Sequence, residues 1–145
     1  MNTIWTIGYE RLLPPQLLAE LQAAGVERVI DVRYRPQSRR PGMSKTRLGE
    51  MLGVYGIAYE HRKALGTPPD IRHEFHAGRV EQARTAFREH VEATAPDALA
   101  QLAFELEGGP RTALLCLEAD PAGCHRRVVC EALADRLPAL RVVDL

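Results

Sequence analysis

The segment RTALLCLEADPAGCHRRVV, residues 111–129, decides the fold class of this chain. Its first part, Arg111–Leu117, is a strand-length run with no charge after its first position, as expected for a buried strand. A polar turn follows, and Val129, Leu133 and Leu137 then recur at helical spacing. A strand that leads through a short turn into a helix is the unit from which parallel α/β sheets are built.

The same alternation of strands and helices runs through the rest of the chain. Runs bounded by turn residues predict further strands at Thr3–Gly8, Glu27–Arg33, Ile57–His61 and Arg141–Asp144. Helix-start signals and apolar spacing predict further helices that begin at Pro14, after an N-cap at Ser44, at Val80 and at Pro96. By contrast, residues 62–78 show no clear period, and we expect a long loop there.

These elements predict an α/β protein, with residues 1–145 as a single domain. Strands that are separated by helices pair in parallel through crossover connections. We therefore expect a three-layer, Rossmann-like domain, with about five mostly parallel strands and helices on both faces of the sheet.

Charge is balanced over the whole chain but not along it. The formal net charge is zero, which argues against a general basic surface for nucleic acid. Residues 32–49 nevertheless contain no acid and carry six cations: Arg33, Arg35, Arg39, Arg40, Lys45 and Arg47. A local positive patch on a neutral protein suits a phosphate-bearing ligand.

The apolar runs and the cysteines bear on where the protein works. No apolar run is long enough to span a membrane, and the N-terminus lacks the pattern of a signal peptide. The three cysteines, Cys116, Cys124 and Cys130, match neither a disulfide framework nor a paired zinc motif. We therefore expect reduced thiols in a cytoplasmic protein that has no membrane partner.

Glycine, polar and ionisable residues collect where the predicted strands end. Gly8 ends the first strand, Asp31 and Arg33 end the second, and Cys116 and Glu118 end the fourth. In open parallel sheets, ligands bind beyond the carboxyl ends of the strands, where the strand order reverses. We therefore expect one ligand site at this edge of the sheet.

Three kinds of chemistry fit residues 116–127. An anion cradle would use backbone N–H groups at a helix N-terminus, with Arg126 as a bidentate contact. A nucleophile site would use Cys116 or Cys124, and we expect His125 and the helix N-terminus to lower the pKa of Cys124. The anion cradle comes first, because the segment lies opposite the acid-free cationic residues 32–49.

A metal site is the third interpretation. The ligands would be Cys116, Glu118, Cys124 and His125, with His61 or Asp31 nearby. This spacing matches no known zinc motif, so we predict neither a metal ion nor another cofactor.

Five segments together resemble the family called domain of unknown function 488. They are TIWTIGYE at Thr3–Glu10, IDVR at Ile30–Arg33, SRRPGMSK at Ser38–Lys45, LGTPPDIR at Leu65–Arg72 and LLCLEADPAGCHRRVV at Leu114–Val129. The resemblance implies a compact α/β domain and implies no settled activity. The family's motifs contain these residues: Gly8, Asp31, Arg33, Ser38, Arg39, Lys45, Glu118, Pro121, Cys124, His125 and Arg126.

Two functions fit these residues best, ahead of a plainer role as an interaction protein whose edge contacts a partner chain. The first is a phosphate-binding cleft, and as an enzyme it would act on a nucleotide, a phosphorylated metabolite or a nucleic-acid end. Its acid–base residues would be Asp31, Glu118 and His125. Its anion-binding residues would be Gly8, Arg33, Ser38, Arg39, Lys45, Cys124 and Arg126. The second is a nucleic-acid-binding module without catalysis, in which Tyr9 or Tyr34 would stack on a base.

Overall fold

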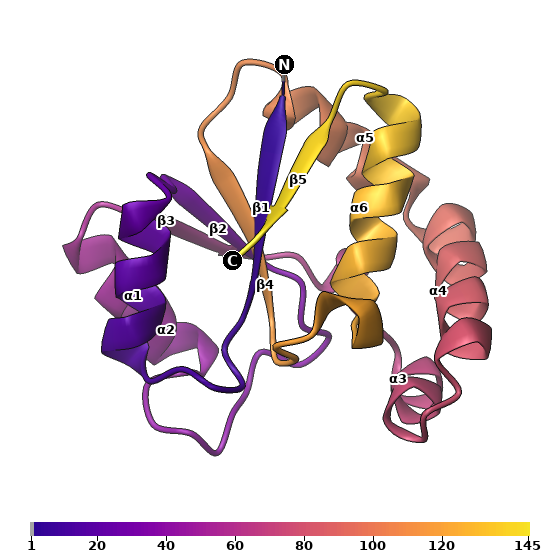
Figure 1. Cartoon of the computed structure of the whole chain (residues 1–145), viewed down its shortest axis with the longest axis horizontal. Helices are drawn as coiled ribbons and strands as arrows, with labels where there is room; N and C mark the ends of the chain where they lie inside the picture. The colour runs from indigo at the N-terminus through magenta and orange to yellow at the C-terminus, as the bar shows by residue number, and fades with distance from the viewer. Residues whose placement is uncertain (1) are drawn as a thin grey trace.

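A single sheet of five parallel strands forms the centre of the computed structural model, which describes residues 2–145. The strands are β1 (Thr3–Gly8), β2 (Arg28–Asp31), β3 (Ala58–His61), β4 (Thr112–Cys116) and β5 (Arg141–Asp144). The helices are α1 (Pro14–Ala23), α2 (Lys45–Val54), α3 (Pro69–His76), α4 (Val80–Thr94), α5 (Pro96–Leu106) and α6 (His125–Arg136). Two short 3₁₀ helices, η1 (Lys63–Leu65) and η2 (Pro121–Gly123), complete the described elements (Figure 1).

β4 is the central strand, and its sequence explains why. It pairs with β2 on one side and β1 on the other, so the strand order is β3-β2-β4-β1-β5. All five of its residues are buried. A strand with both faces covered carries apolar residues without alternation, which is the pattern at Thr112–Cys116. The two edge strands, β3 and β5, are partly exposed by contrast.

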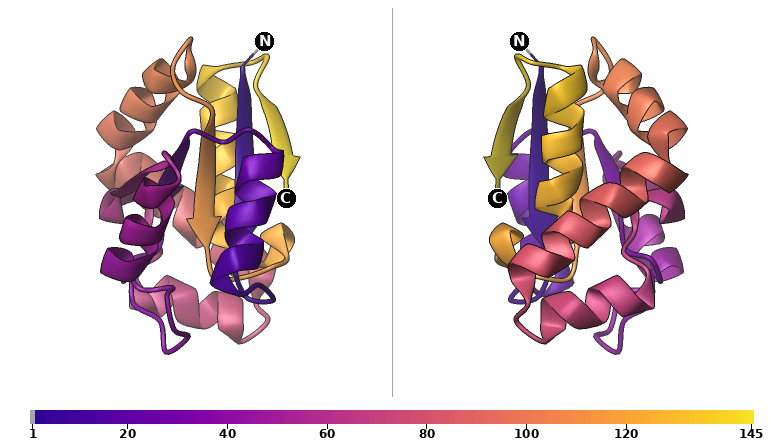
Figure 2. Two further views of the ribbon diagram at one scale, coloured as in Figure 1. Left: turned by 90° about the vertical axis from the view of Figure 1, so that its left-hand side faces the viewer. Right: turned by 90° about the vertical axis from the view of Figure 1, so that its right-hand side faces the viewer.

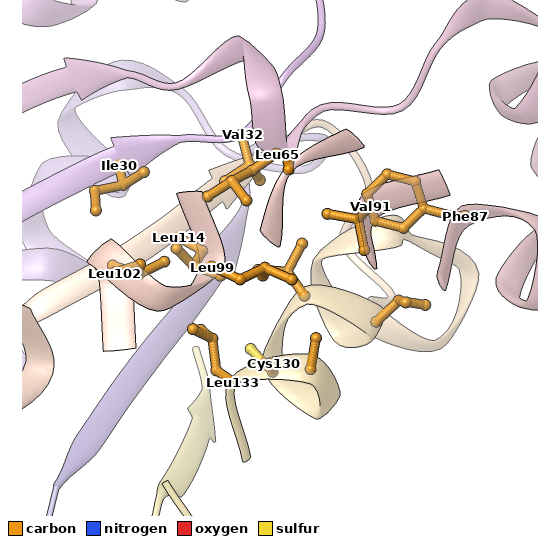
Figure 3. Packing of buried hydrophobic residues seen from close by; sticks show 14 of the residues in the cluster. Ile30, Val32, Leu65, Phe87, Val91, Leu99, Leu102, Leu114, Cys130 and Leu133 are labelled. Atoms are coloured by element: carbon orange, nitrogen blue, oxygen red, sulfur yellow. The ribbon is translucent and has the colours of Figure 1, made fainter. Parts of the chain in front are cut away.

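Helices cover both faces of the sheet and create two cores (Figure 2). On one face, α1 and α2 pack against strand residues that include Ile7, Val29 and Leu115. On the other face, α3, α4, α5 and α6 pack against strand residues that include Ile30 and Leu114. Figure 3 shows part of this second core. Its members also include Cys130, Phe87, Leu99 and Leu133.

The chain leaves the neighbouring strands β1 and β4 in opposite directions. From β1 it passes through α1 to β2, beyond β4, and from β4 it passes through α6 to β5, beyond β1. Gly8 lies opposite Cys116 at the ends of these two strands. Such a reversal opens a crevice at the carboxyl edge of a parallel sheet. Helix α3 lies across this edge in both views of Figure 2.

The structure confirms the predicted α/β class, the three layers and the five strands, and all of these strands are parallel. The strand order was not predictable from the pattern, and it differs from the 3-2-1-4-5 order of the Rossmann fold because β4 lies between β2 and β1. None of the helices within residues 2–145 is long and apolar enough to cross a bilayer.

One local prediction was wrong. Residues 62–78 are not a long loop, because η1 and the eight-residue helix α3 lie within them. Only Ile71 and Phe75 of α3 are buried, one helical turn apart, and this is too little apolar spacing to predict a helix. Ser44 is the N-cap residue of α2, as predicted, although its side chain makes no capping hydrogen bond. Its hydroxyl instead accepts from the backbone N–H of Ser38, at 2.9 Å.

Candidate functional site

A cleft lies at the carboxyl edge of the sheet, where the strand ends predicted a ligand site. Its walls are formed by the segments that follow β1, β2 and β4, by the turn before α6, and by helix α3. The lining residues are Tyr9, Arg33, Tyr34, Arg35, Gln37, Thr67, Arg72, Phe75, Cys116, Leu117, Glu118, Gly123, Cys124 and His125. The cleft continues outward past Pro69, His73 and His76 of α3.

Asp31 and Arg33 form a buried ion pair at the end of β2. The guanidinium of Arg33 donates from Nη2 to Asp31 Oδ2 at 2.7 Å and from Nε to Oδ1 at 2.9 Å. Tyr59 donates its hydroxyl proton to the same carboxylate. Arg33 Nη1 also donates to the carbonyl of Met43, at 2.7 Å, and contacts Tyr9 Oη at 3.2 Å. Asp31, a predicted acid–base residue, is fully buried and does not line the cleft.

The surroundings of Arg33 and Tyr59 keep both side chains protonated. Burial disfavours the charge of Arg33, but the hydrogen bond and the charge of Asp31 outweigh this cost and raise the pKa of Arg33. Burial, together with the hydrogen bond to Asp31, also raises the pKa of Tyr59 above its usual range. The ion pair therefore braces the segment after β2.

The rest of the cationic segment divides into inward and outward residues. Arg40 donates to the backbone carbonyls of Tyr9, at 2.7 Å, and of Glu10, so it ties this segment to the end of β1. Arg39 and Lys45 are exposed and do not line the cleft. Ser38 does not line it either. Its hydroxyl accepts from the backbone N–H of Arg40 at 3.0 Å.

Gly8 is needed for packing. A Cβ atom at this position would lie 1.7 Å from the carbonyl oxygen of Glu118, so only glycine lets the turn after β4 approach β1 this closely. The backbone N–H groups of Tyr9 and Glu10 continue the pairing with the carbonyls of Cys116 and Leu117, at 3.2 and 2.8 Å. Gly8 thus shapes the cleft without lining it.

Arg126 is fully buried and points into the turn after β4. Its Nη1 donates to the carbonyl of Glu118, and its Nη2 donates to the carbonyl of Ala119 at 3.2 Å. Nη1 also lies 2.8 Å from Cys116 Sγ. Burial disfavours the charge of Arg126, but the nearby Cys116 and Cys124 raise its pKa. Arg126 was predicted as a bidentate anion contact, and the structure places it outside the cleft lining.

His125 is buried and oriented by the backbone. Its Nε2 lies 2.7 Å from the carbonyl of Val32, and a carbonyl only accepts, so Nε2 carries the proton. Nδ1 is then the acceptor and lies 3.6 Å from Cys124 Sγ. The ring also packs edge-on against Phe87, with 5.3 Å between ring centroids. Burial lowers the pKa of His125, so the imidazole is neutral near pH 7.

The pKa of Cys124 contradicts the prediction from its position. Cys124 precedes the first residue of α6, where the helix dipole favours a thiolate. However, burial and the neighbouring Cys116 raise its pKa well above the usual value. Desolvation therefore outweighs the helix terminus, and Cys124 is a neutral thiol.

Glu118 remains an ionised carboxylate on the wall of the cleft. Burial favours its neutral form, but hydrogen bonds with its own backbone N–H, with His76 and with Cys124 lower its pKa. His76 Nε2 lies 3.2 Å from Glu118 Oε1, so this contact links α3 to the turn after β4.

The structure thus brings together part of the predicted site. Arg33, Glu118, Cys124 and His125 line one cleft. The remaining predicted residues lie behind it or outside it: Gly8, Asp31, Ser38, Arg39, Lys45 and Arg126.

Arg35, Arg72 and Thr67 line the cleft, but they were not among the predicted site residues. Arg35 follows β2, and Arg72 lies on α3; neither side chain makes a hydrogen bond or ion pair with residues 2–145. Thr67 is only 3% exposed, and its hydroxyl has no partner among the same residues. Arg35 was noted as one of six cations and as a residue that follows the second strand, but it was not chosen as a site residue. Arg72 and Thr67 fall in the segment that was expected to be a loop.

One cluster within residues 2–145 brings possible metal-binding atoms together. The donor atoms of Cys116, Glu118 and Cys124 all lie within 4.8 Å of one another. The guanidinium of Arg126 contacts Cys116 Sγ and would repel a metal ion there. His61 and Asp31 are held elsewhere, by the carbonyl of Arg33 at 2.7 Å and by the Arg33 guanidinium. We therefore do not assign these residues as metal ligands.

Comparison with known proteins identifies a family. Searches of the curated proteins and of the solved structures find no match. The family model described as "Domain of unknown function DUF488" matches residues 14–133, which include α1 to α5, β2 to β4 and most of α6. The chain therefore belongs to the DUF488 family.

Proposed function

We propose that the cleft binds an anionic ligand through a phosphate group, as found in a nucleotide, a phosphorylated metabolite or a nucleic-acid end. The observation that carries this proposal is the pair Arg35 and Arg72, which line one cleft and have no acceptor among residues 2–145. A guanidinium is a donor only, so both side chains are available to an incoming acceptor. The buried hydroxyl of Thr67, also without a partner in this part of the chain, adds a third polar contact.

The chemistry of these donors favours phosphate. The planar fork of arginine matches two oxygens of a phosphate or carboxylate at once. Arg33 lines the same cleft, but Asp31 neutralises it, so the positive charge available to a ligand comes from Arg35 and Arg72. Arg39 and Lys45, exposed on the same segment, would attract an anion at longer range.

Catalysis would use Glu118 and His125. Both line the cleft, Glu118 as an ionised carboxylate and His125 as a neutral imidazole. Two unprotonated bases beside a bound phosphate ester could accept the proton of an attacking water or hydroxyl group. We therefore propose hydrolysis or transfer at the phosphate as the reaction class. Asp31 would act as a positioning residue, because its carboxylate is bound by Arg33 and Tyr59.

Nucleic-acid binding without catalysis is the second candidate. It is favoured by the exposed cations Arg35, Arg39, Lys45 and Arg47 on one segment. Two features weaken it: Arg33 and Arg40 of this segment donate to the chain itself, and Lys63 already lies 4.6 Å above the ring of Tyr34. We also propose a cytoplasmic location, because the three cysteines are free and buried, as is usual in a reducing compartment.

Calorimetric titration of the full chain with inorganic phosphate and with adenosine monophosphate tests the binding proposal. We expect Arg72→Gln and Arg35→Gln each to weaken binding about tenfold or more, because each removes a charged hydrogen bond. Arg47→Gln is the matched control: Arg47 is exposed on α2, outside the cleft lining, and this change should leave the affinity unchanged. Equal affinities in all three variants would contradict the assignment.

Two further measurements separate the candidate functions. Glu118→Gln and His125→Gln should retain phosphate binding but lose turnover of a phosphate ester that the wild-type protein converts. Binding of a single-stranded oligonucleotide should fall only weakly with salt, with a slope of about 1.4 on logarithmic axes if two arginines contact phosphates. A slope of about 3.5, as expected for five contacts, would favour the nucleic-acid module.

A further inference from the structure

Arg126 is a buried cation without a carboxylate partner. Its side chain is fully buried, yet no acid among residues 2–145 forms an ion pair with it. Its contacts are two backbone carbonyls and the sulfur of Cys116, and its Nε has no partner in this part of the chain. A buried charge is costly unless an opposite charge lies beside it. A contacting atom that can become an anion is Cys116 Sγ, at 2.8 Å from Nη1.

We propose that Arg126 holds Cys116 as a thiolate, and that Cys116 and Cys124 form a reactive pair that a peroxide converts into a disulfide. A thiolate beside a guanidinium is the nucleophilic form of cysteine. The carbonyl of Glu118 lies 4.0 Å from Cys116 Sγ, at the far limit for a thiol hydrogen bond, whereas Arg126 Nη1 lies only 2.8 Å from the same sulfur. This proposal requires no bound phosphate and therefore stands apart from the proposed function.

The second thiol of the pair is Cys124. Its sulfur belongs to the cluster whose donor atoms, with those of Cys116 and Glu118, lie within 4.8 Å of one another. Both cysteines line the cleft, so a molecule as small as hydrogen peroxide has a route to them although each is only 1% exposed. Cys124 is also 3.6 Å from His125 Nδ1, which is placed to accept its proton.

The proposed reaction balances in two steps. The thiolate of Cys116 attacks one oxygen of hydrogen peroxide, the O–O bond breaks, hydroxide leaves, and Cys116 becomes a sulfenic acid. The sulfur of Cys124 then attacks the sulfur of Cys116, the S–O bond breaks, and a disulfide forms. The thiol proton of Cys124 passes to His125 Nδ1 and then to the departing hydroxide, which leaves as water. The cysteines lose two electrons, which reduce one peroxide.

Cys130 provides a matched control within the same chain. It is also buried, but it packs in the core among residues that include Leu133, and it does not line the cleft (Figure 3). Burial raises the pKa of Cys130 to about 12, so this thiol is neutral. Burial alone does not distinguish Cys130 from the other two cysteines. Cys130 differs because its sulfur neither accepts a hydrogen bond from the Arg126 guanidinium nor lines the cleft.

The test treats the reduced full-length protein with hydrogen peroxide and follows intact mass and peptide maps. The wild-type chain and Cys130→Ser should each lose the mass of two hydrogen atoms, with Cys116 linked to Cys124. Cys124→Ser should instead gain one oxygen atom at Cys116, which a sulfenic-acid trap captures. Cys116→Ser should keep its thiols under the same treatment. Circular dichroism checks that the variants fold, and the wild-type peptide map alone tests the pairing if they do not.

Three results would overturn the proposal. The first is a wild-type chain that keeps all three thiols at peroxide levels that oxidise free cysteine. The second is a disulfide that includes Cys130, or a sulfenic acid that maps to Cys124. The third is a stoichiometric zinc ion that the reduced protein binds and that Cys116→Ser loses, since the two cysteines would then be metal ligands. Failure of phosphate binding leaves each of these results unaffected.

Discussion

At the scale of single residues, the arginines around the cleft divide according to where their acceptors lie. Arg33, Arg40 and Arg126 donate to acceptors of the chain itself, whereas Arg35 and Arg72 have none among residues 2–145. The sequence predicted Arg33 and Arg126 as anion contacts because each follows a strand within a motif. Whether a guanidinium turns toward its own backbone depends on carbonyls brought close by the tertiary fold, and local sequence does not contain that information.

Gly8 carries a prediction at the same scale. Gly8→Ala places Cβ against the carbonyl of Glu118, 1.7 Å away, so backbone must move. We expect a loss of about 2 kcal/mol or more in the free energy of unfolding, measured by urea denaturation. Gly53→Ala is the control, because no atom lies near its Cβ in α2, and it should stabilise the chain by about 0.5 to 1 kcal/mol. Equal effects of the two substitutions would show that Gly8 is not required for close packing.

His125 predicts a pH dependence of stability. Burial lowers its pKa in the folded protein, so the unfolded chain takes up this proton at higher pH than the folded chain does. The contribution of His125 to the free energy of unfolding is complete above about pH 6.5 and is lost as the pH falls through its lowered pKa in the folded protein. Glutamates, with an unfolded pKa of about 4.3, lose their contributions only at lower pH. Urea denaturation between neutral pH and about pH 5 should show wild-type stability falling more steeply than that of His125→Gln. Parallel pH profiles would contradict this role.

At the scale of elements, helix α3 completes the cleft. It contributes Arg72 and Phe75 to the lining, and His76 contacts Glu118 on the opposite wall. Buried strands such as β4 could be predicted, because a continuous run of apolar residues indicates that both faces of the strand are covered. α3 could not be predicted, because a short helix with two buried side chains depends on the surface it docks on.

Phe75 tests how far the cleft depends on this docking. Phe75→Ala removes one of the two buried side chains of α3. We expect the free energy of local unfolding of α3 to fall by about 3 kcal/mol. Hydrogen exchange should speed up in α3 but not in β4, and phosphate affinity should fall because Arg72 loses its position. Phe104→Ala is the control, since Phe104 is 72% exposed on α5 and its loss should change stability by less than about 0.5 kcal/mol. Unchanged exchange in α3 would contradict the docking.

At the scale of the whole molecule, strand order places the site. The helix and strand pattern predicted three layers and a site at the carboxyl edge, and the structure has its cleft at that edge. The pattern did not predict that β4 lies between β2 and β1, because pairing partners are chosen by contacts between distant segments. This order makes Gly8 and Cys116 neighbours. It also brings the segments that follow β1, β2 and β4 side by side at the carboxyl edge of the sheet. The neutral net charge is compatible with one local binding site for an anion.

The cleft is proposed to bind a phosphate group between α3 and the segment after β2. The most direct measurement is a crystal structure of the full chain grown with inorganic phosphate. We predict a phosphate ion within hydrogen-bonding distance of the Arg35 and Arg72 guanidinium groups and of Thr67 Oγ1. A cleft that holds only ordered water at saturating phosphate, or a metal ion bound by Cys116, Glu118 and Cys124, would contradict the claim.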